Sequence, residues 1–290
     1  MSVALVTDST AYLPEDLRAA GGIRVVPLHV VVGGKEHYEG LDITTGDVAA
    51  ALRSFTPVTT SRPSPRAFLM AYTAAAEAGA THVVSTHISG DLSATIAGAE
   101  LAASESPVPV TVIDSQSLGM AMGYAVSSGA ALAAGGASAE EVAAHVRARC
   151  ASARVDFYVD TLEYLRRGGR IGKASALMGS ALAIKPILGL EGGSIVPLEK
   201  VRTASRAIAR LEERAGERIA DAMAAGHGVD VAVHHLDSAE RAEALAARLT
   251  ARVGDAGEVR VVELGAVVGA HVGPGTLAIA VCPGAPAGSP

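Results

Sequence analysis

Residues 81–95 constrain the fold most, because they combine a strand, a small polar loop and the start of a helix in immediate succession. Val83 and Val84 form a β-branched run typical of a buried strand, and the polar loop after them is typical of a turn. Helical sequence follows from Ala94. The first turn of a helix leaves backbone N–H groups unpaired, which favours an anion. Ser93 is therefore interpreted either as an anion-binding hydroxyl or simply as the helix N-cap.

Strand-like and helix-like segments alternate through the first half of the chain. This alternation predicts an α/β fold with a mostly parallel sheet and helices on both faces. Small hydroxyl residues follow four predicted strands, at 7–10, 59–61, 85–93 and 114–117. Because the carboxyl ends of parallel strands lie along one edge of a sheet, we expect these clusters to converge there.

The alternation of strand-like and helix-like segments changes near residue 154, where predicted hairpin turns appear among the helices. We predict a first α/β domain at 1–153, a second α/β domain at 154–282 with mixed or antiparallel pairing, and a disordered tail at 283–290. Within the second domain, residues 174–183 are expected to form an apolar helix. Residues 270–276, which include His271, are expected to form a loop.

Composition excludes several classes of protein. The net charge of −6 over 290 residues argues against a nucleic-acid binder. The two cysteines lie far apart, form no metal-ligand pattern and are typical of a reducing compartment. The first residues contain no basic region of a signal peptide, and no uninterrupted apolar run is long enough to span a bilayer. A cytoplasmic protein without a metal site is predicted.

A basic cluster stands out in this acidic chain. Residues 161–210 contain nine Lys or Arg and three Glu, a local charge of +6. The contrast predicts a local anionic partner or substrate, and the alternative is an ordinary solvated face.

Signals for catalysis are weak. Asp8 and Asp114, each at a predicted strand end and each followed by Ser, could form a carboxylate pair, but Asx turns are the simpler interpretation. The sequence has neither a GxxxxGK[ST] phosphate loop nor a nucleophile motif, which favours a binding protein. The alternative is an enzyme that acts on a small phosphorylated or carboxylated ligand at the same anion site.

Several motifs, spread over nearly the whole chain, match a known pattern. They are VTDSTAYLP at 6–14, TSRPSP at 60–65, HISGDLSAT at 87–95, VIDSQSLGMAMG at 112–123, TLEYLRRGGRIGKASALMG at 161–179, IKPIL at 184–188, KVRT at 200–203 and HVGPG at 271–275. In these motifs the chain resembles the DegV family, whose best-understood members are the fatty-acid-binding subunits of bacterial fatty acid kinase.

The resemblance implies a two-domain fold that holds one long-chain fatty acid between its domains, with no further cofactor. A separate kinase subunit would phosphorylate the acyl group, and transient contact with a membrane surface or an acyltransferase is also implied. The carboxylate-binding residues would be Thr60, Ser61, Ser93 and His271. The lining of the head site and tunnel would include Ser89, Leu92, Met120, Met178 and Ile184. Contact with the kinase or the acyl phosphate would involve Arg170, Lys200 and Arg202.

The head-site motif departs from the family pattern at several positions. Gly90 and Asp91 replace the usual serine and glycine, and Ala94 stands where glycine is usual. An acid beside a carboxylate site would repel the ligand unless Asp91 points to water or pairs with a cation. Arg62, where glutamine is common, is a candidate for that cation.

Overall fold

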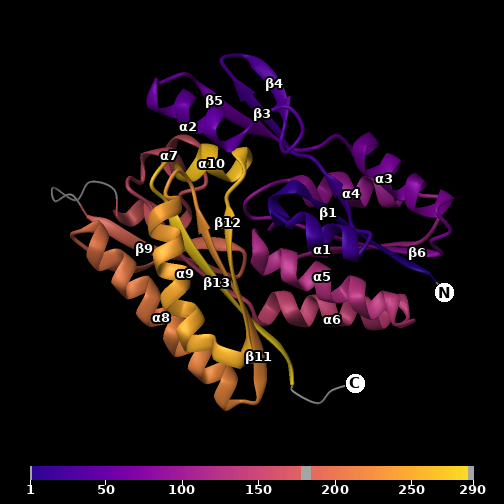
Figure 1. Cartoon of the computed structure of the whole chain (residues 1–290). Helices are drawn as coiled ribbons and strands as arrows, with labels where there is room; N and C mark the ends of the chain where they lie inside the picture. Colours follow the sequence, from indigo (N-terminus) through magenta and orange to yellow (C-terminus); the bar gives the residue numbers. More distant parts are fainter. Residues whose placement is uncertain (1, 178–183, 287–290) are drawn as a thin grey trace.

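The computed structural model describes residues 2–177 and 184–286, and its first sheet is the predicted parallel one (Figure 1). Its four strands run in the order β2-β1-β6-β7, and every neighbouring pair is parallel. Neighbouring residues point to opposite faces of a strand. Leu5 accordingly packs under α5 and α6, whereas Val6 packs under α3 and α4. The elements are β1 (Val3–Asp8), α1 (Glu15–Ala20), β2 (Arg24–Val26), α3 (Pro65–Glu77), β6 (His82–His87), α4 (Thr95–Ala103), β7 (Val110–Asp114), α5 (Met120–Ala134) and α6 (Ala139–Ser152).

A small antiparallel sheet is inserted between β2 and α3. Its strand order is β4-β3-β5, and it consists of β3 (His29–Val32), β4 (Lys35–Tyr38) and β5 (Val58–Ser61), with α2 (Thr45–Arg53) beside it. The β-branched run from Arg24 to Val32 reads as one strand in sequence but divides between two sheets. Pro27 lies at the division, where its missing N–H suits a strand end.

The second large sheet is mixed, as predicted, in the order β10-β9-β8-β13-β11-β12. Only β11 and β12 pair in parallel. Helices α8 and α9 lie together on one face of this sheet and bury its largest apolar cluster (Figure 1). The elements are β8 (Arg154–Tyr158), α7 (Glu163–Arg167), β9 (Lys185–Glu191), β10 (Ser194–Val201), α8 (Ala204–Ala224), β11 (His227–His235), α9 (Ala239–Val253), β12 (Gly257–Glu263), α10 (Ala266–Val272) and β13 (Leu277–Pro286). Short 3-10 turns lie at Ser9–Ala11, Gly172–Leu177 and Gly254–Ala256.

Three local expectations for the second half differ from the structure. The segment with His271 was expected to be a loop, but it ends a helix, α10, and the turn begins only at Gly273. The expected helix at 174–183 is a 3-10 helix over Gly172–Leu177, and its remainder lies outside the described residues. The expected tail from 283 is wrong at its start, because β13 pairs with β11 as far as Pro286.

The boundary between the two halves is crossed by apolar packing but not by strand pairing. Among the described strands, none before Ala153 pairs with one after it. However, Leu28, Val30 and Val48 of the first half form one core with Val267 and Ala270 of α10. The two-domain division therefore stays a prediction. In the part of the chain that the structure describes, no helix has the length and apolar character needed to cross a bilayer.

Candidate functional site

A cavity between the two halves collects the polar residues that the sequence singled out. We call it the head cavity. Its polar lining is Thr60, Ser61, Arg62, Ser93, Arg170 and His271, and its apolar lining is Leu28, Ile88, Leu92, Leu118, Leu165, Ile195, Val267, Val268 and Val272. All four residues expected to bind a carboxylate line this one space. The hydroxyl clusters that carry Thr60 and Ser93 therefore meet at this cavity, but not along one edge of a parallel sheet as expected, because Thr60 lies on β5 of the small antiparallel sheet.

Thr60 and His271 form the best-defined contact in the head cavity. Thr60 lies on β5 and is half-buried, while the next residue, Ser61, is exposed. Thr60 Oγ1 lies 2.8 Å from Nε2 of His271, at the last turn of α10. Burial, with a smaller contribution from Arg170, lowers the pKa of His271 to about 4, so the ring is neutral at pH 7. Its Nδ1 is buried without a hydrogen-bond partner among the described residues and faces Gly168, where a Cβ would collide with it.

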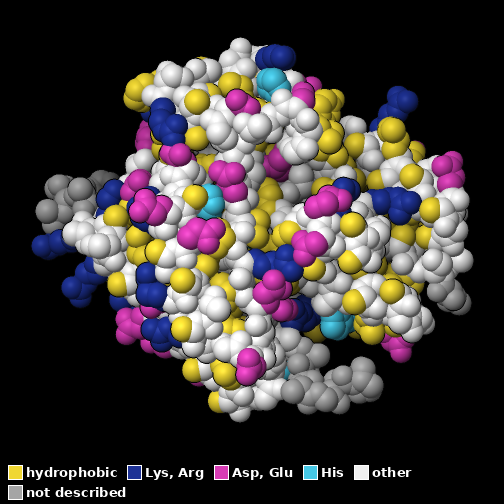
Figure 2. Space-filling view, viewed as in Figure 1, with side chains coloured by type: hydrophobic (Ala, Val, Ile, Leu, Met, Phe, Trp, Pro, Cys, Tyr) yellow, Lys and Arg dark blue, Asp and Glu magenta, His cyan; other side chains and the backbone are white. Residues whose placement is uncertain are grey.

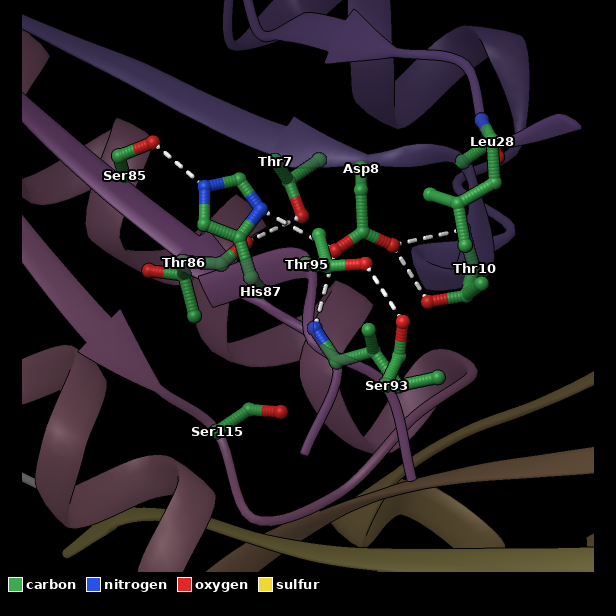
Figure 3. Close-up of polar contacts among 12 residues, drawn as sticks. Thr7, Asp8, Thr10, Leu28, Ser85, Thr86, His87, Ser93, Thr95 and Ser115 are labelled. Atoms are coloured by element: carbon green, nitrogen blue, oxygen red, sulfur yellow. Dashed lines mark hydrogen bonds and ion pairs between the residues drawn. The ribbon is translucent and has the colours of Figure 1, made fainter. Parts of the chain in front are cut away.

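Ser93 is not the cap of the helix that follows it. The N-cap position of α4 is Ala94, which makes no side-chain cap bond. Ser93 Oγ instead lies 2.8 Å from Thr95 Oγ1 at the head cavity (Figure 3). The simple N-cap interpretation of Ser93 is therefore wrong, because its hydroxyl does not cap α4.

Arg170 lies inside the site. It is half-buried and lines the head cavity beside His271. Its Nε donates to the carbonyl oxygen of Leu92 at 3.0 Å, and Nη1 donates to that of Gly168 at 2.6 Å. These bonds hold a guanidinium, whose planar fork suits a carboxylate or a phosphate, at the polar end of the cavity.

The head cavity adjoins an almost wholly apolar space, which we call the apolar slot. Leu118, Ile195, Val268 and Val272 line both spaces, so the two are adjacent. The slot is completed by Val155, Phe157, Leu190, Leu264, Thr276 and Ala278. Counted together with the parts that are open to solvent, the empty volume is about 550 Å³ for the head cavity and about 390 Å³ for the slot.

The head cavity also borders a surface depression, which we call the outer groove. Thr60, Arg170 and His271 line both spaces. Farther out, the groove is lined by residues such as Phe55, which is 83% exposed, and Arg167. The polar end of the site is thus only one layer of side chains away from the protein surface.

The other predicted lining residues divide into several groups. Leu92 lines the head cavity, and Ile184 packs against the apolar cluster around it. Ser89 is buried, and its Oγ donates to the carbonyl oxygen of Gly193 at 2.8 Å, so it connects the two halves. Met120 is fully buried in a separate core cluster. Met178 lies outside the described residues.

Asp91 is directed away from the head cavity. Its Oδ2 accepts a hydrogen bond from the hydroxyl of Ser194, at the start of β10. Arg62, the expected partner of Asp91, instead donates to the carbonyl oxygen of Ala94 at 3.4 Å. The bonds of Ser89 and Asp91 together form what we call the hairpin latch, which joins the loop after β6 to the β9–β10 hairpin.

A buried polar chain behind the site has the order Asp–His–Ser (Figure 3). His87 Nδ1 lies 3.1 Å from Asp8 Oδ2, and His87 Nε2 lies 2.7 Å from Ser85 Oγ. All three residues are fully buried, and the Ser85 hydroxyl also lies 2.9 Å from the Tyr72 hydroxyl. A nucleophile must reach its substrate, so this chain is structural rather than catalytic.

The carboxylate-pair interpretation of Asp8 and Asp114 is also wrong. Asp8 accepts from the backbone N–H of Thr10, and Asp114 accepts from that of Gln116, which are the predicted Asx-type bonds. Within the described residues, no group of three or more His, Cys, Asp or Glu side chains could hold a metal ion.

Four of the nine residues of the basic cluster form ion pairs with described residues. Glu163 pairs with Arg166 and Arg167, and Glu199 pairs with Arg210. Figure 2 shows basic and acidic side chains interspersed over α8 and α9. Lys200 and Arg202 are exposed and form no ion pair with described residues. Most of the cluster thus fits the solvated-face interpretation.

Comparison with known proteins identifies the family of this chain. A sequence model described as an uncharacterised protein of the DegV family matches residues 2–284. A DegV domain-containing protein of Streptomyces coelicolor is 52% identical over 96% of this chain and 98% of its own length. Protein DegV of Bacillus subtilis is 32% identical over 97% of this chain and 99% of its own. The chain therefore belongs to the DegV family, as the motifs predicted.

Solved structures agree with this assignment. A DegV family protein from Thermus thermophilus, described by its fatty acid binding, superposes with a TM-score of 0.85 at 38% identity and covers 98% of this chain and 100% of its own. DegV of Bacillus subtilis, described as a fatty acid binding protein, has a TM-score of 0.88 at 32% identity and covers 97% of this chain and 99% of its own. The predicted fold class is confirmed.

Proposed function

We propose that this protein binds a long-chain fatty acid, with the carboxylate in the head cavity and the alkyl chain in the apolar slot. The observation that carries the proposal is the adjacency of the two spaces: a polar end with Thr60, Ser93, Arg170 and His271 lies beside a slot with an almost wholly apolar lining. A fatty acid has the same division into a small charged head and a long apolar tail. The fatty acid binding described for the Thermus and Bacillus relatives supports the same ligand class.

Within this proposal, Arg170 neutralises the carboxylate while the hydroxyls of Thr60 and Ser93 donate to it. Ser61 lies at the exposed rim of the same cavity. Neutral His271 has one ring N–H, and its contact with Thr60 orients both side chains. Charge-assisted hydrogen bonds of this kind are about twice as strong as neutral ones, which offsets part of the cost of removing a carboxylate from water.

We further propose that the bound acyl group is phosphorylated in place by a separate kinase subunit. The chain contains no GxxxxGK[ST] phosphate loop, which favours an external phosphate donor. Thr60, Arg170 and His271 border the outer groove, so a partner seated there would reach the carboxylate without release of the fatty acid. Exposed Lys200 and Arg202 are available to acidic groups of that partner.

The decisive experiment is denaturing lipid extraction with mass analysis of protein purified from bacteria. Wild-type protein should yield fatty acid at close to one molecule per chain. Arg170→Ala should lose most of it, because the carboxylate would lie in the cavity without its cation. The matched control is Arg167→Ala, which removes an exposed arginine from the outer groove alone and should retain the lipid.

Two results would change the proposal. Arg170→Ala protein that retains its lipid but is no longer phosphorylated by a cognate kinase would assign Arg170 to presentation of the head group rather than to its binding. Wild-type protein free of lipid, and unable to take up added fatty acid, would refute the carrier function and favour the enzyme alternative.

A further inference from the structure

The apolar slot adjoins a second, polar space, which we call the distal cleft. The distal cleft has an empty volume of about 1170 Å³, and its charged lining includes Asp114, Arg147, Arg154, Asp156, Glu191 and Arg218. Val155 and Leu190 are the two residues that line both the slot and the cleft. They therefore form the wall between an apolar space and a charged one.

The two wall residues lie on neighbouring antiparallel strands. Asp156 of β8 pairs with Gly189 of β9, so the next position in register places Val155 beside Leu190. Val155 is 6% exposed, and Leu190 is half-buried. Both pack in the core cluster that contains fully buried Met120. Met120, expected to line the tunnel, thus lies behind this wall and supports it.

We propose that Val155 and Leu190 determine the longest acyl chain that the slot accommodates, an inference that rests on the proposed function. Each methylene that leaves water for the slot tightens binding about fourfold. A methylene that passed the wall would enter the distal cleft, where charged side chains and water surround it and this gain disappears. Affinity should therefore rise with chain length up to the wall and then level off.

The test measures dissociation constants for saturated fatty acids of roughly C12 to C22, a range over which the fourfold gain per methylene is easily resolved. In wild-type protein the plot of affinity against length should have a break point. Leu190→Ala removes three carbon atoms from the wall and should move the break point to chains about two carbons longer. Val155→Leu adds bulk and should move it to chains about one carbon shorter.

The matched control is Leu198→Ala. Leu198 lines the distal cleft from the neighbouring strand β10 but does not line the slot, so its truncation should leave the break point in place. Thermal unfolding of each variant checks that it is folded. If Leu190→Ala does not fold, Val155→Leu alone still tests whether the wall sets the break point. A wild-type break point that neither wall variant moves overturns the proposal. Absence of fatty-acid binding by wild-type protein would instead refute the proposed function.

Discussion

Ser93 has two possible roles, as the N-cap of a helix or as a ligand for a carboxylate. As a cap, its loss would lower stability. As a ligand for a carboxylate, its loss would lower affinity. The structure places Ala94 at the N-cap of α4 and leaves Ser93 at the head cavity, so the two effects can be separated by experiment.

We predict that Ser93→Ala weakens fatty-acid binding about 10- to 100-fold, the value of a hydrogen bond to a charged group, with little change in melting temperature. Titration with a fluorescent fatty acid and thermal unfolding measure the two quantities. The control is Ser138→Ala, which removes a true capping box from α6 and should cost about 1 kcal/mol of stability without affecting binding. If Ser93→Ala binds fatty acid as tightly as the wild-type protein, Ser93 does not bind the carboxylate.

Sequence predicted the hydroxyls and His271 of the head cavity but assigned Arg170 elsewhere. The reason is that the position of Arg170 depends on a carbonyl oxygen 78 positions away, that of Leu92. No local pattern contains that contact. A contact with the kinase would place Arg170 at the surface, whereas the fold turns its side chain into the head cavity.

At the scale of elements, α10 is the least predictable part of the site. Its sequence contains Gly269 and several β-branched residues, which are poor helix formers, and the Gly-Pro-Gly run after it is typical of a turn. Contacts from distant elements stabilise the helix. Glu39 accepts from the backbone N–H of Val267, and the Tyr12 hydroxyl lies 3.3 Å from the N–H of Val268. Tertiary contacts thus override the local preference, whereas the four parallel strands and their helices followed their local patterns.

Glu39 makes this arrangement sensitive to pH. Burial raises its pKa from 4.5 to about 7, although the hydrogen bonds from Ser9 and Val267 act in the opposite direction. Between these values the carboxyl group ionises in the unfolded chain but stays protonated in the folded one. Its contribution to stability is therefore complete below pH 4.5 and is lost as the pH rises to about 7.

We predict that wild-type protein loses roughly 3 kcal/mol relative to Glu39→Gln between these two pH values. Urea unfolding of both proteins at a series of pH values gives the difference. This comparison cancels the buried His234 and His271, whose pKa values, both lowered to about 4, change stability in the same range with the opposite sign. Parallel stability profiles for the two proteins would show that Glu39 does not titrate in this range.

At the scale of the whole molecule, the hairpin latch joins the two halves of the chain beside the site. Ser89 and Asp91 of the first half bond to Gly193 and Ser194 of the second, and the next residue, Ile195, lines both the head cavity and the apolar slot. We predict that exchange of a bound fatty acid requires this hairpin to move. The resemblance to the DegV family predicted that the ligand would lie between two domains, but it did not predict the latch, in which Asp91 is a departure from the family pattern and Ser89 is not.

We predict that Asp91→Ala accelerates release of bound fatty acid about fivefold, because a hydrogen bond of roughly 1 kcal/mol no longer holds the hairpin closed. Stopped-flow transfer of a fluorescent fatty acid to acceptor vesicles measures the rate. Asp221→Ala, on the exposed face of α8, changes the net charge equally and should release at the wild-type rate. Equal rates for all three proteins would mean that another movement limits exchange.

The core that α10 shares with the small sheet also has a consequence for biosynthesis. Leu28, Val30 and Val48 emerge early from the ribosome, but Val267 and Ala270, which cover them, are translated more than two hundred residues later. At about 5 to 20 residues per second, this apolar face stays uncovered for roughly 10 to 40 s. We therefore expect the nascent N-terminal half to bind chaperones that recognise exposed apolar surface. The site closes only when the last helix of the chain has been synthesised.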